Sequence, residues 1–189
     1  IPVACEAVTA LQAYIARRTA FFDPAVLSIT RIQAGSTHNI IPGEVDILGT
    51  LRTLSDESRR AGREAFVRVL TNVAAAHGCE ADARIDEGYP ATRNDPRAVS
   101  LIAEITGDLF GSGTYTEMPN PIMGGEDFAY VLQRVPGAMA FLGVAPPEED
   151  AANRAPLHNS RMTVHEDWLQ RGVALHCAFA TRFLARGWD

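Results

Sequence analysis

Two alternating apolar segments joined by a Pro-Gly turn, residues 23–35 and 44–54, constrain the fold of this chain most strongly. Alternation with a period of two is typical of strands that bury one face, and Pro42-Gly43 suits the connecting turn. In the second segment, one face carries Val45, Ile47, Gly49 and Leu51, and the other carries Asp46, Leu48, Thr50 and Arg52. An arginine near the end of an apolar strand needs a partner, which the rest of the chain has to supply.

Helical patterns flank these two segments. Residues 3–18 and 56–76 carry apolar side chains at helical spacing; Ser55 is placed to cap the second helix and Gly78 follows its end. Residues 79–88 alternate again, which predicts a third strand. One further strand in front of this order would give the ferredoxin-like βαββαβ arrangement. Since the chain starts with isoleucine inside a helical pattern, we expect it to be part of a longer protein.

The proline-bearing segment 89–96 is the best domain boundary, and it divides the chain into residues 1–90 and 91–189. The second region alternates helical and strand patterns, which predicts an α/β layer. Its expected elements are a helix at 96–109, a strand near 114–117, a helix at 127–134, a strand at 138–144 and a helix at 164–186. One face of the last helix carries Leu169, Val173, Cys177, Ala180 and Leu184.

Composition excludes several function classes. With 189 residues, 47% apolar and 21% charged, the chain is globular rather than disordered. The net charge of -6 and the dispersed arginines argue against nucleic acid as a partner, and no apolar run reaches the ~18 residues of a membrane span. The three cysteines form no CxxC pair, so we interpret them as reduced core thiols of a cytoplasmic protein. The sequence has no lysine, which excludes Schiff-base and P-loop lysine chemistry within this chain.

His158 lies in the polar loop APLHNSR before the last helix. It is either an exposed surface histidine or a metal ligand or general base, because neutral imidazole is a common ligand for zinc-type metals. One histidine does not make a metal site, so the other ligands would come from elsewhere. The remaining histidines are interpreted as structural or exposed; they are His38, His77, His165 and His176.

Two glycines and two acids in the segment MGGEDF precede a helical pattern. Acids in a first helical turn interact favourably with the helix dipole and glycines permit a tight turn, so the motif can be purely structural. Alternatively, the backbone N–H groups of Gly124 and Gly125 face a substrate. Glu126 and Asp127 are adjacent and point in different directions on a helix, which excludes a paired acid-base dyad.

Asn39 and Arg52 also have two interpretations each. Asn39 can close an Asx-type turn, or its amide group can donate to a developing oxyanion. Arg52 can pair with Asp46 on its own strand face or reach solvent. In a functional role, its guanidinium can hold a substrate carboxylate through two hydrogen bonds.

Taken in order along the chain, three motifs resemble the M20 metallopeptidase family. They are LSITRIQAGSTHNIIPGEVDILGTLRT, GGEDFAYVLQRVPGAMAFLGV and PLHNS, followed by a terminal amphipathic helix. The chain is most similar to the amidohydrolase branch of that family, which includes hippurate hydrolases, N-acyl-amino-acid amidohydrolases and auxin-conjugate hydrolases. The resemblance covers essentially all 189 residues.

This resemblance implies an α/β fold in two parts. Residues 1–90 would be a ferredoxin-like lid and dimerisation domain without its first strand, and residues 91–189 the C-terminal part of an α/β catalytic domain. It implies two divalent metal ions, zinc or manganese, and a small N-acyl amino acid or similar amide as substrate. The family also has an N-terminal catalytic segment with most of the metal ligands and the general base. We therefore expect this chain alone to be inactive, and the longer protein to be a cytoplasmic homodimer joined through the lid.

Three residues match functional positions of the family. His158 matches the last metal ligand, Asn39 the lid asparagine that contacts the substrate carbonyl, and Arg52 the lid arginine that holds the substrate carboxylate. A loosely assigned cleft-lining motif is matched by Gly124, Gly125 and Glu126. The implied reaction is metal-assisted amide hydrolysis, in which Asn39 holds the oxyanion and lid closure brings Asn39 and Arg52 onto the substrate.

Two other functions remain open. A non-catalytic ferredoxin-like module for dimerisation or ligand binding would explain residues 1–88, but it gives no reason for the MGGEDF and PLHNS motifs. A dipeptidase or carboxypeptidase of the same superfamily would share the motifs and would differ in acting on peptides rather than on N-acyl amino acids.

Overall fold

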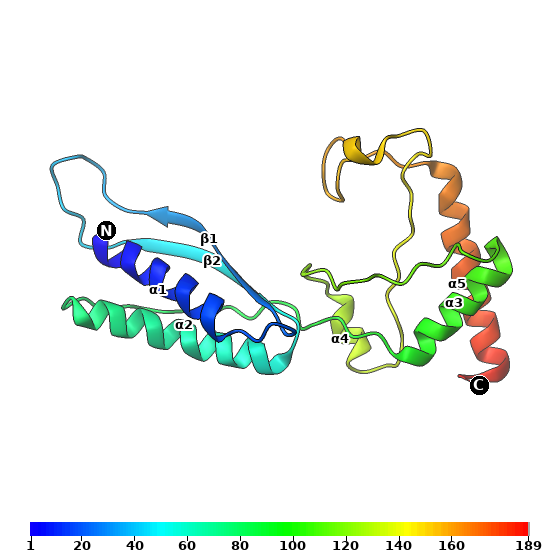
Figure 1. The fold of residues 1–189 in the computed structure, drawn as a ribbon, viewed down its shortest axis with the longest axis horizontal. Helices are drawn as coiled ribbons and strands as arrows, with labels where there is room; N and C mark the ends of the chain where they lie inside the picture. The colour runs from blue at the N-terminus through cyan, green and yellow to red at the C-terminus, as the bar shows by residue number, and fades with distance from the viewer. Residues whose placement is uncertain (189) are drawn as a thin grey trace. The chain divides into compact units, whose positions relative to one another are not determined.

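The computed structural model describes residues 1–188, which fold as two compact units. Unit 1 comprises residues 1–91 and 122–127, and unit 2 comprises residues 92–121 and the chain from residue 128 onward. Each unit is described by itself. The mixed α/β class expected from the sequence is confirmed (Figure 1).

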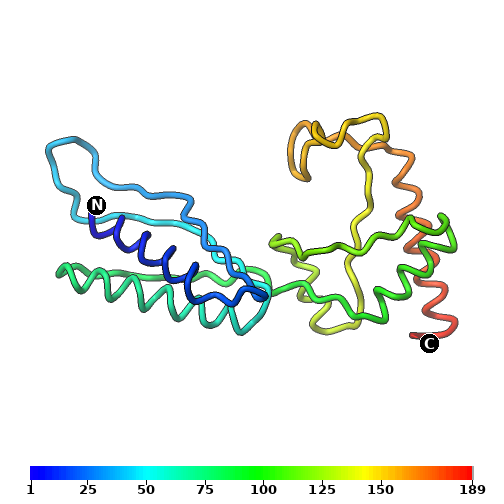
Figure 2. The backbone as a smooth tube through the Cα atoms, in the orientation of Figure 1, coloured from blue at the N-terminus to red at the C-terminus, as the bar shows by residue number. Residues whose placement is uncertain are grey.

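Unit 1 is a two-stranded antiparallel sheet with two helices on one face. Its elements are α1 (Pro2–Arg18), β1 (Ala25–Gln33), β2 (Asp46–Thr53) and α2 (Asp56–Ala76). The register pairs Ala25 with Thr53 at one end of the ladder and Gln33 with Asp46 at the other. The two helices lie side by side against the sheet (Figure 1 and Figure 2). The core between them contains Ala7, Leu11, Leu27, Ala65 and Ala74.

Both ends of α2 follow from local sequence chemistry. At the start, the hydroxyl of Ser55 accepts a hydrogen bond from the Ser58 N–H at 3.0 Å, as an N-cap does. At the end, Gly78 has a φ of +66°, and the N–H of Cys79 donates to the carbonyl of Ala74 at 2.9 Å. This is a Schellman arrangement, which needs a residue that tolerates the left-handed conformation. The predicted bounds of this helix are therefore confirmed.

Gly49 marks a close approach between the two strands. The ladder is irregular between Ile29 and Arg31, and Gly49 pairs with Ile29 at this point. A β-carbon on Gly49 would lie 2.5 Å from the carbonyl oxygen of Ser28, which is shorter than any van der Waals contact. Glycine is therefore required here by space, since the obstacle is backbone and cannot rotate away.

We expect Gly49→Ala to lower the free energy of unfolding by about 2 kcal/mol, because the strands must separate to admit the methyl group. Gly43→Ala is the matched control. It lies in the preceding loop, where no atom stands within 4 Å of its β-carbon position, so it should change stability by less than about 0.5 kcal/mol. Denaturant unfolding of both variants measures the difference. If Gly49→Ala were as stable as Gly43→Ala, β1 and β2 could separate at this position at little cost.

The strand predicted at residues 79–88 is wrong, since the backbone there pairs with no strand of the described chain. Every second side chain from 81 to 85 is nevertheless half-buried, which is the alternation that suggested a strand. A strand also needs a neighbour for its ladder of backbone hydrogen bonds. The segment is instead held to α2 by Arg59, which donates to the carbonyl of Gly88 at 2.8 Å. The ferredoxin-like order stays a prediction.

Unit 2 is built on two long helices that pack against each other. Its elements are α3 (Pro96–Phe110), α4 (Phe128–Leu132), the 3₁₀ turns η1 (Ala151–Asn153) and η2 (Glu166–Trp168), and α5 (Leu169–Arg186). Asp95 caps α3 by accepting a hydrogen bond from the Arg97 N–H at 2.9 Å. Hydrogen bonds from Arg97 lower the pKa of Asp95 to about 2, so this cap is ionised at neutral pH.

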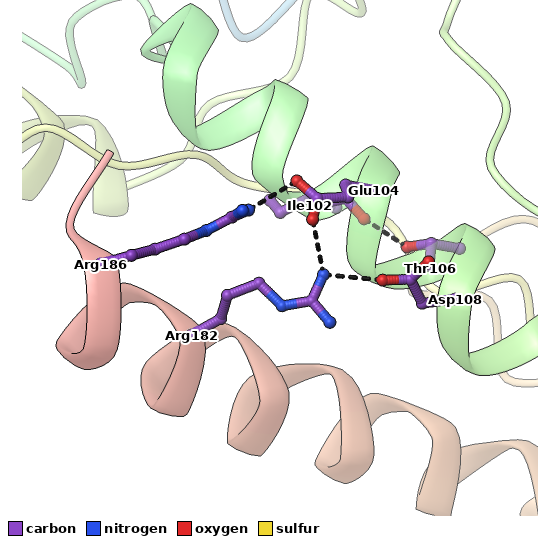
Figure 3. A network of polar contacts seen from close by, with 6 residues as sticks. All are labelled: Ile102, Glu104, Thr106, Asp108, Arg182 and Arg186. Carbon is purple, nitrogen blue, oxygen red and sulfur yellow. Dashed lines mark hydrogen bonds and ion pairs between the residues drawn. The ribbon is translucent and has the colours of Figure 1, made fainter. Parts of the chain in front are cut away.

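Charged side chains of α5 reach across to acidic side chains of α3 (Figure 3). Arg182 on α5 lies 2.8 Å from both Glu104 and Asp108 on α3, and Arg186 lies 2.6 Å from Glu104. The hydrogen bond and charge of Asp108 raise the pKa of the Arg182 guanidinium. These pairs are partly exposed, so they fix the register of the two helices more than they add to stability.

The strands predicted near 114–117 and at 138–144 are also wrong, and the helix predicted at 127–134 is shorter. No strand of the described chain runs beside these segments. Around Met139 a side chain supplies the missing partners: Asn94 accepts from the Met139 N–H at 2.9 Å and donates to its carbonyl at 3.1 Å. The backbone groups are thus satisfied without a ladder.

The apolar face predicted for the last helix exists but is not covered within unit 2. Val173 is 65% exposed and Leu184 is 84% exposed, whereas Leu175, Phe179 and Arg182 of α5 are half-buried. The cysteine interpretation needs a correction as well. Cys5, Cys79 and Cys177 are free thiols, but all three are exposed and none belongs to a core. No helix in the described part of the chain combines the length and the apolar character needed to cross a membrane.

Candidate functional site

Arg52 lies on the uncovered face of the unit 1 sheet, near the end of β2 and opposite Val26. The exposed guanidinium donates from Nη1 to the backbone carbonyl of Met123 at 2.6 Å. It does not pair with Asp46, which was one of the two structural alternatives for this residue; the other alternative, exposure to solvent, agrees with the structure. The partner of the unusual strand arginine is therefore the backbone of the MGGEDF segment, seventy-one positions further along the chain.

The guanidinium of Arg52 has further N–H donors besides the one bound to the carbonyl of Met123. Among the described residues, no carboxylate lies within ion-pair distance of it, whereas several other arginines are paired with acids. Those arginines are Arg63, Arg84, Arg97, Arg182 and Arg186. A guanidinium has five N–H donors and binds carboxylates through two of them at once. An anionic ligand would therefore meet a positive charge that no acid of the described chain neutralises.

The glycines of the MGGEDF segment lie beside this arginine. A β-carbon on Gly125 would lie 3.3 Å from Cδ2 of Tyr89, while nothing stands within 4 Å of the same position on Gly124. Neither glycine has a positive φ, so the backbone conformation does not require glycine here. Both are exposed and Glu126 is half-buried. The structure thus brings Arg52 and the glycine motif together within unit 1.

Asn39 lies at the tip of the loop between β1 and β2 and is exposed. Its side-chain oxygen accepts a hydrogen bond from the Thr37 hydroxyl at 3.3 Å, not from the N–H of Ile41 that an Asx turn would use. An amide with an occupied oxygen keeps two N–H donors. The base of the same loop lines an open hollow of about 300 Å³, with Gln33, Ser36, Ile40 and Glu44 among its walls.

His158 lies in unit 2, at the third position of a turn in which the N–H of Asn159 donates to the carbonyl of Pro156 at 3.1 Å. Its φ is +68°, and it is the only non-glycine residue of the described chain with a positive φ. The left-handed conformation is uncommon outside glycine and often marks functional sites. The side chain is exposed, so its ring nitrogens are accessible to a metal ion.

The residues present do not complete a metal centre. The described part of the chain contains no group of three His, Cys, Asp or Glu side chains that could hold an ion. His158 offers one accessible imidazole, and one histidine by itself does not hold a metal ion. Sequence reasoning missed two groups of the candidate site. They are the carbonyl of Met123, which binds Arg52, and the ring of Tyr89, which lies next to Gly125. A backbone carbonyl leaves no signal in the sequence. The only signal for Tyr89 was an aromatic residue before a proline at the predicted domain boundary.

Comparison with known proteins gives a consistent result along the whole chain. The model of peptidase family M20/M25/M40 matches residues 7–182. IAA-amino acid hydrolase ILR1-like 4 of Arabidopsis thaliana is 30% identical over 188 residues, which are 97% of this chain and 42% of that protein. Thermostable carboxypeptidase 1 of Saccharolobus solfataricus is 28% identical over 182 residues, which are 96% of this chain and 45% of that protein.

A solved structure has a similar fold. The YXEP protein of Bacillus subtilis, described as a dinuclear metal binding peptidase from the M20 family, superposes with a TM-score of 0.78 at 29% identity. The alignment covers 98% of this chain and 46% of that protein. The chain therefore spans less than half the length of these relatives.

Proposed function

Because the chain belongs to peptidase family M20/M25/M40, we propose that the full-length protein hydrolyses the amide bond of small N-acyl amino acids with two divalent metal ions, zinc or manganese. The observation that carries this proposal is Arg52. It is a strand arginine without an acidic partner among the described residues, and it lies beside a glycine-rich backbone segment. That arrangement suits a small ligand that ends in a carboxylate.

Each candidate residue has a defined task in this proposal. Arg52 holds the α-carboxylate of the substrate, and Asn39 donates its amide N–H to the oxyanion that develops on the scissile carbonyl. His158 is one metal ligand. The metal ions, when bound, act as Lewis acids and lower the pKa of water. Gly124, Gly125 and Glu126 line the side of the site next to Arg52.

Unit 1 is proposed to act as the lid and as the dimerisation surface of the longer protein. Its sheet has only two strands in the described chain, so each strand keeps one edge with free backbone N–H and C=O groups. Pairing of such edges across a two-fold axis is a common way to join two copies. Light scattering of the full-length protein would test the homodimer, and a monomer at micromolar concentration would contradict it. The cytoplasm stays the proposed location.

A carboxypeptidase or dipeptidase is the second candidate, and Arg52 suits it equally. Peptides and N-acyl amino acids both end in a free carboxylate. The two relatives described above have names of both kinds, a hydrolase of IAA-amino acids and a carboxypeptidase. The two candidate activities differ in the group on the other side of the scissile bond, which is an acyl group or an amino acid. An assay with both kinds of substrate distinguishes them, whereas the described site residues do not.

The test is an assay of the natural gene product at full length, whose intact mass is measured first. We expect hydrolysis of N-acetyl amino acids to exceed that of dipeptides, and to be lost with a chelator and restored with zinc or manganese. Faster cleavage of dipeptides would favour the second candidate. A natural product of 20.4 kDa, the mass of this chain, that cleaves neither class would favour the non-catalytic module.

We expect Arg52→Ala to raise KM for an N-acetyl amino acid by about 100-fold and to change kcat little, because it removes binding energy that is present before and during the reaction. The C-terminal carboxamide of the same substrate should show almost no change in KM. Arg31→Ala is the control, since Arg31 is an exposed arginine on the neighbouring strand β1. Equal effects on the acid and the carboxamide would contradict the carboxylate role.

A further inference from the structure

The segment 122–127 belongs to unit 1 although the chain on both sides of it belongs to unit 2. Two contacts attach it there. The carbonyl of Met123 accepts the hydrogen bond from Arg52, and the ring of Tyr89 lies next to Gly125, where a β-carbon would stand 3.3 Å from Cδ2 of the ring. The two attachment points are two residues apart, so a shift at one of them moves the other.

The position of Tyr89 is itself well determined. Arg59 donates to the carbonyl of Gly88 at 2.8 Å, and Arg63 forms an ion pair with Glu87, so α2 holds the two residues before it. Pro90 follows, and a residue before proline is restricted to extended conformations. The backbone before Tyr89 is therefore held to α2 and its own conformation is restricted, while the side chain itself is 55% exposed.

We propose that Tyr89 and Gly125 are positioning residues for Arg52. The ring of Tyr89 sets how closely segment 122–127 approaches the sheet, and this distance sets where the carbonyl of Met123 holds the guanidinium. The proposal rests on the proposed role of Arg52 as the carboxylate-binding residue. It gives the site-lining Gly125 a positioning task and adds Tyr89, and neither residue needs to touch the substrate to act in this way.

Space, rather than backbone conformation, favours glycine at position 125. A β-carbon there would approach Cδ2 of Tyr89 to 3.3 Å, which is tighter than ordinary contact, so the ring or the segment has to give way by a few tenths of an ångström. Under this proposal it is the segment that is pushed away from the ring. Since the segment is also attached at Met123, that push is transmitted to the hydrogen bond with Arg52. Arg52 then loses the acceptor that fixes its orientation, and a mobile guanidinium binds a carboxylate less well.

The first experiment measures the kinetics of Gly125→Ala in the full-length protein. We expect KM for an N-acetyl amino acid to rise by about tenfold, and KM for its carboxamide to rise by less than about twofold. A general loss of folding would lower kcat for both substrates instead. Equal changes in KM for the acid and the carboxamide would overturn the proposal.

A double variant separates positioning from direct obstruction of the substrate. In Tyr89→Ala with Gly125→Ala, the new methyl group occupies the space that the ring has left, so KM for the acid should return to within about threefold of the wild type. If the methyl group obstructs the substrate directly, the double variant stays as impaired as Gly125→Ala. Simple addition of the two single effects would likewise overturn the proposal.

A second readout does not depend on catalysis. In guanidinium NMR spectra of the full-length protein, the bonded N–H of Arg52 should give a signal protected from solvent exchange. The signal should persist in Gly124→Ala, which adds a methyl group to open space, and disappear in Gly125→Ala. If the full-length wild type hydrolyses no amide, the proposed function fails and this spectrum still decides the positioning. Persistence of the signal in Gly125→Ala would overturn it.

Discussion

Replacing Asn39 by alanine is expected to lower kcat of the full-length protein by about 100- to 1,000-fold in the proposed amide hydrolysis, with little change in KM. The amide N–H groups would meet an oxyanion that exists only in the transition state, so their loss does not weaken binding of the substrate itself. Asn39 is exposed at the tip of its loop, and its oxygen is already occupied by the Thr37 hydroxyl at 3.3 Å. The two N–H donors of the amide are the part that can act on an oxyanion, because an oxyanion only accepts hydrogen bonds.

Two further variants make this expectation specific. Asn39→Asp keeps the shape but replaces donors by a negative charge, so it should be at least as impaired as the alanine variant. His38→Ala changes the neighbouring exposed residue of the same loop, and should leave kcat within about twofold of the wild type. A rise in KM without loss of kcat in Asn39→Ala would contradict the oxyanion role and leave Asn39 as a binding residue.

Elements with a local cause were predicted well. The ends of α2 depend on a serine that caps the first turn and on a glycine that permits a left-handed residue, and both causes lie within a few residues of the ends they define. β1 and β2 follow each other directly in the chain, so each predicted strand has its partner next to it in the sequence. In these cases, the sequence contains the element and its neighbour together.

The three wrong strands share a different cause. Residues 79–88, 114–117 and 138–144 have strand-like composition, but a strand is completed by a neighbour, and the described chain provides none for them. Within the described part of unit 2, helix α5 also lacks a neighbour on one side. Its apolar face was predicted correctly, but Val173 and Leu184 on that face are exposed. Helical spacing thus predicted which face of α5 is apolar. Spacing alone does not predict whether other residues cover that face.

The candidate site shows the same division. Arg52 was recognisable as a polar residue in an apolar strand, and His158 as a histidine in a loop before a long helix. The carbonyl of Met123 was not predictable, because every residue has a carbonyl and only the fold selects one of them. The left-handed conformation of His158 was equally invisible, since it depends on the turn around it and not on the residue type.

The left-handed backbone conformation of His158 allows a variant that separates a metal ligand from a structural residue. Replacing His158 by glycine should lower kcat/KM of the full-length protein by more than about 100-fold and reduce its bound metal, while its thermal stability stays the same or rises slightly. Glycine adopts a φ near +68° at no steric cost, so the variant removes the imidazole and relaxes the backbone at the same time. His158→Ala removes the ligand but keeps the strained position, and should be the less stable of the two.

The measurements are metal content by mass spectrometry, kcat/KM and melting temperature on the same preparations. His176→Ala is the matched control, because His176 is exposed on α5 and has no proposed role. Loss of metal and activity in His158→Gly without loss of stability would separate a ligand from a structural histidine, which a single alanine variant cannot do. Full metal content together with unchanged kcat/KM in His158→Gly would show that the strained turn serves the fold and that the metal ligand lies elsewhere.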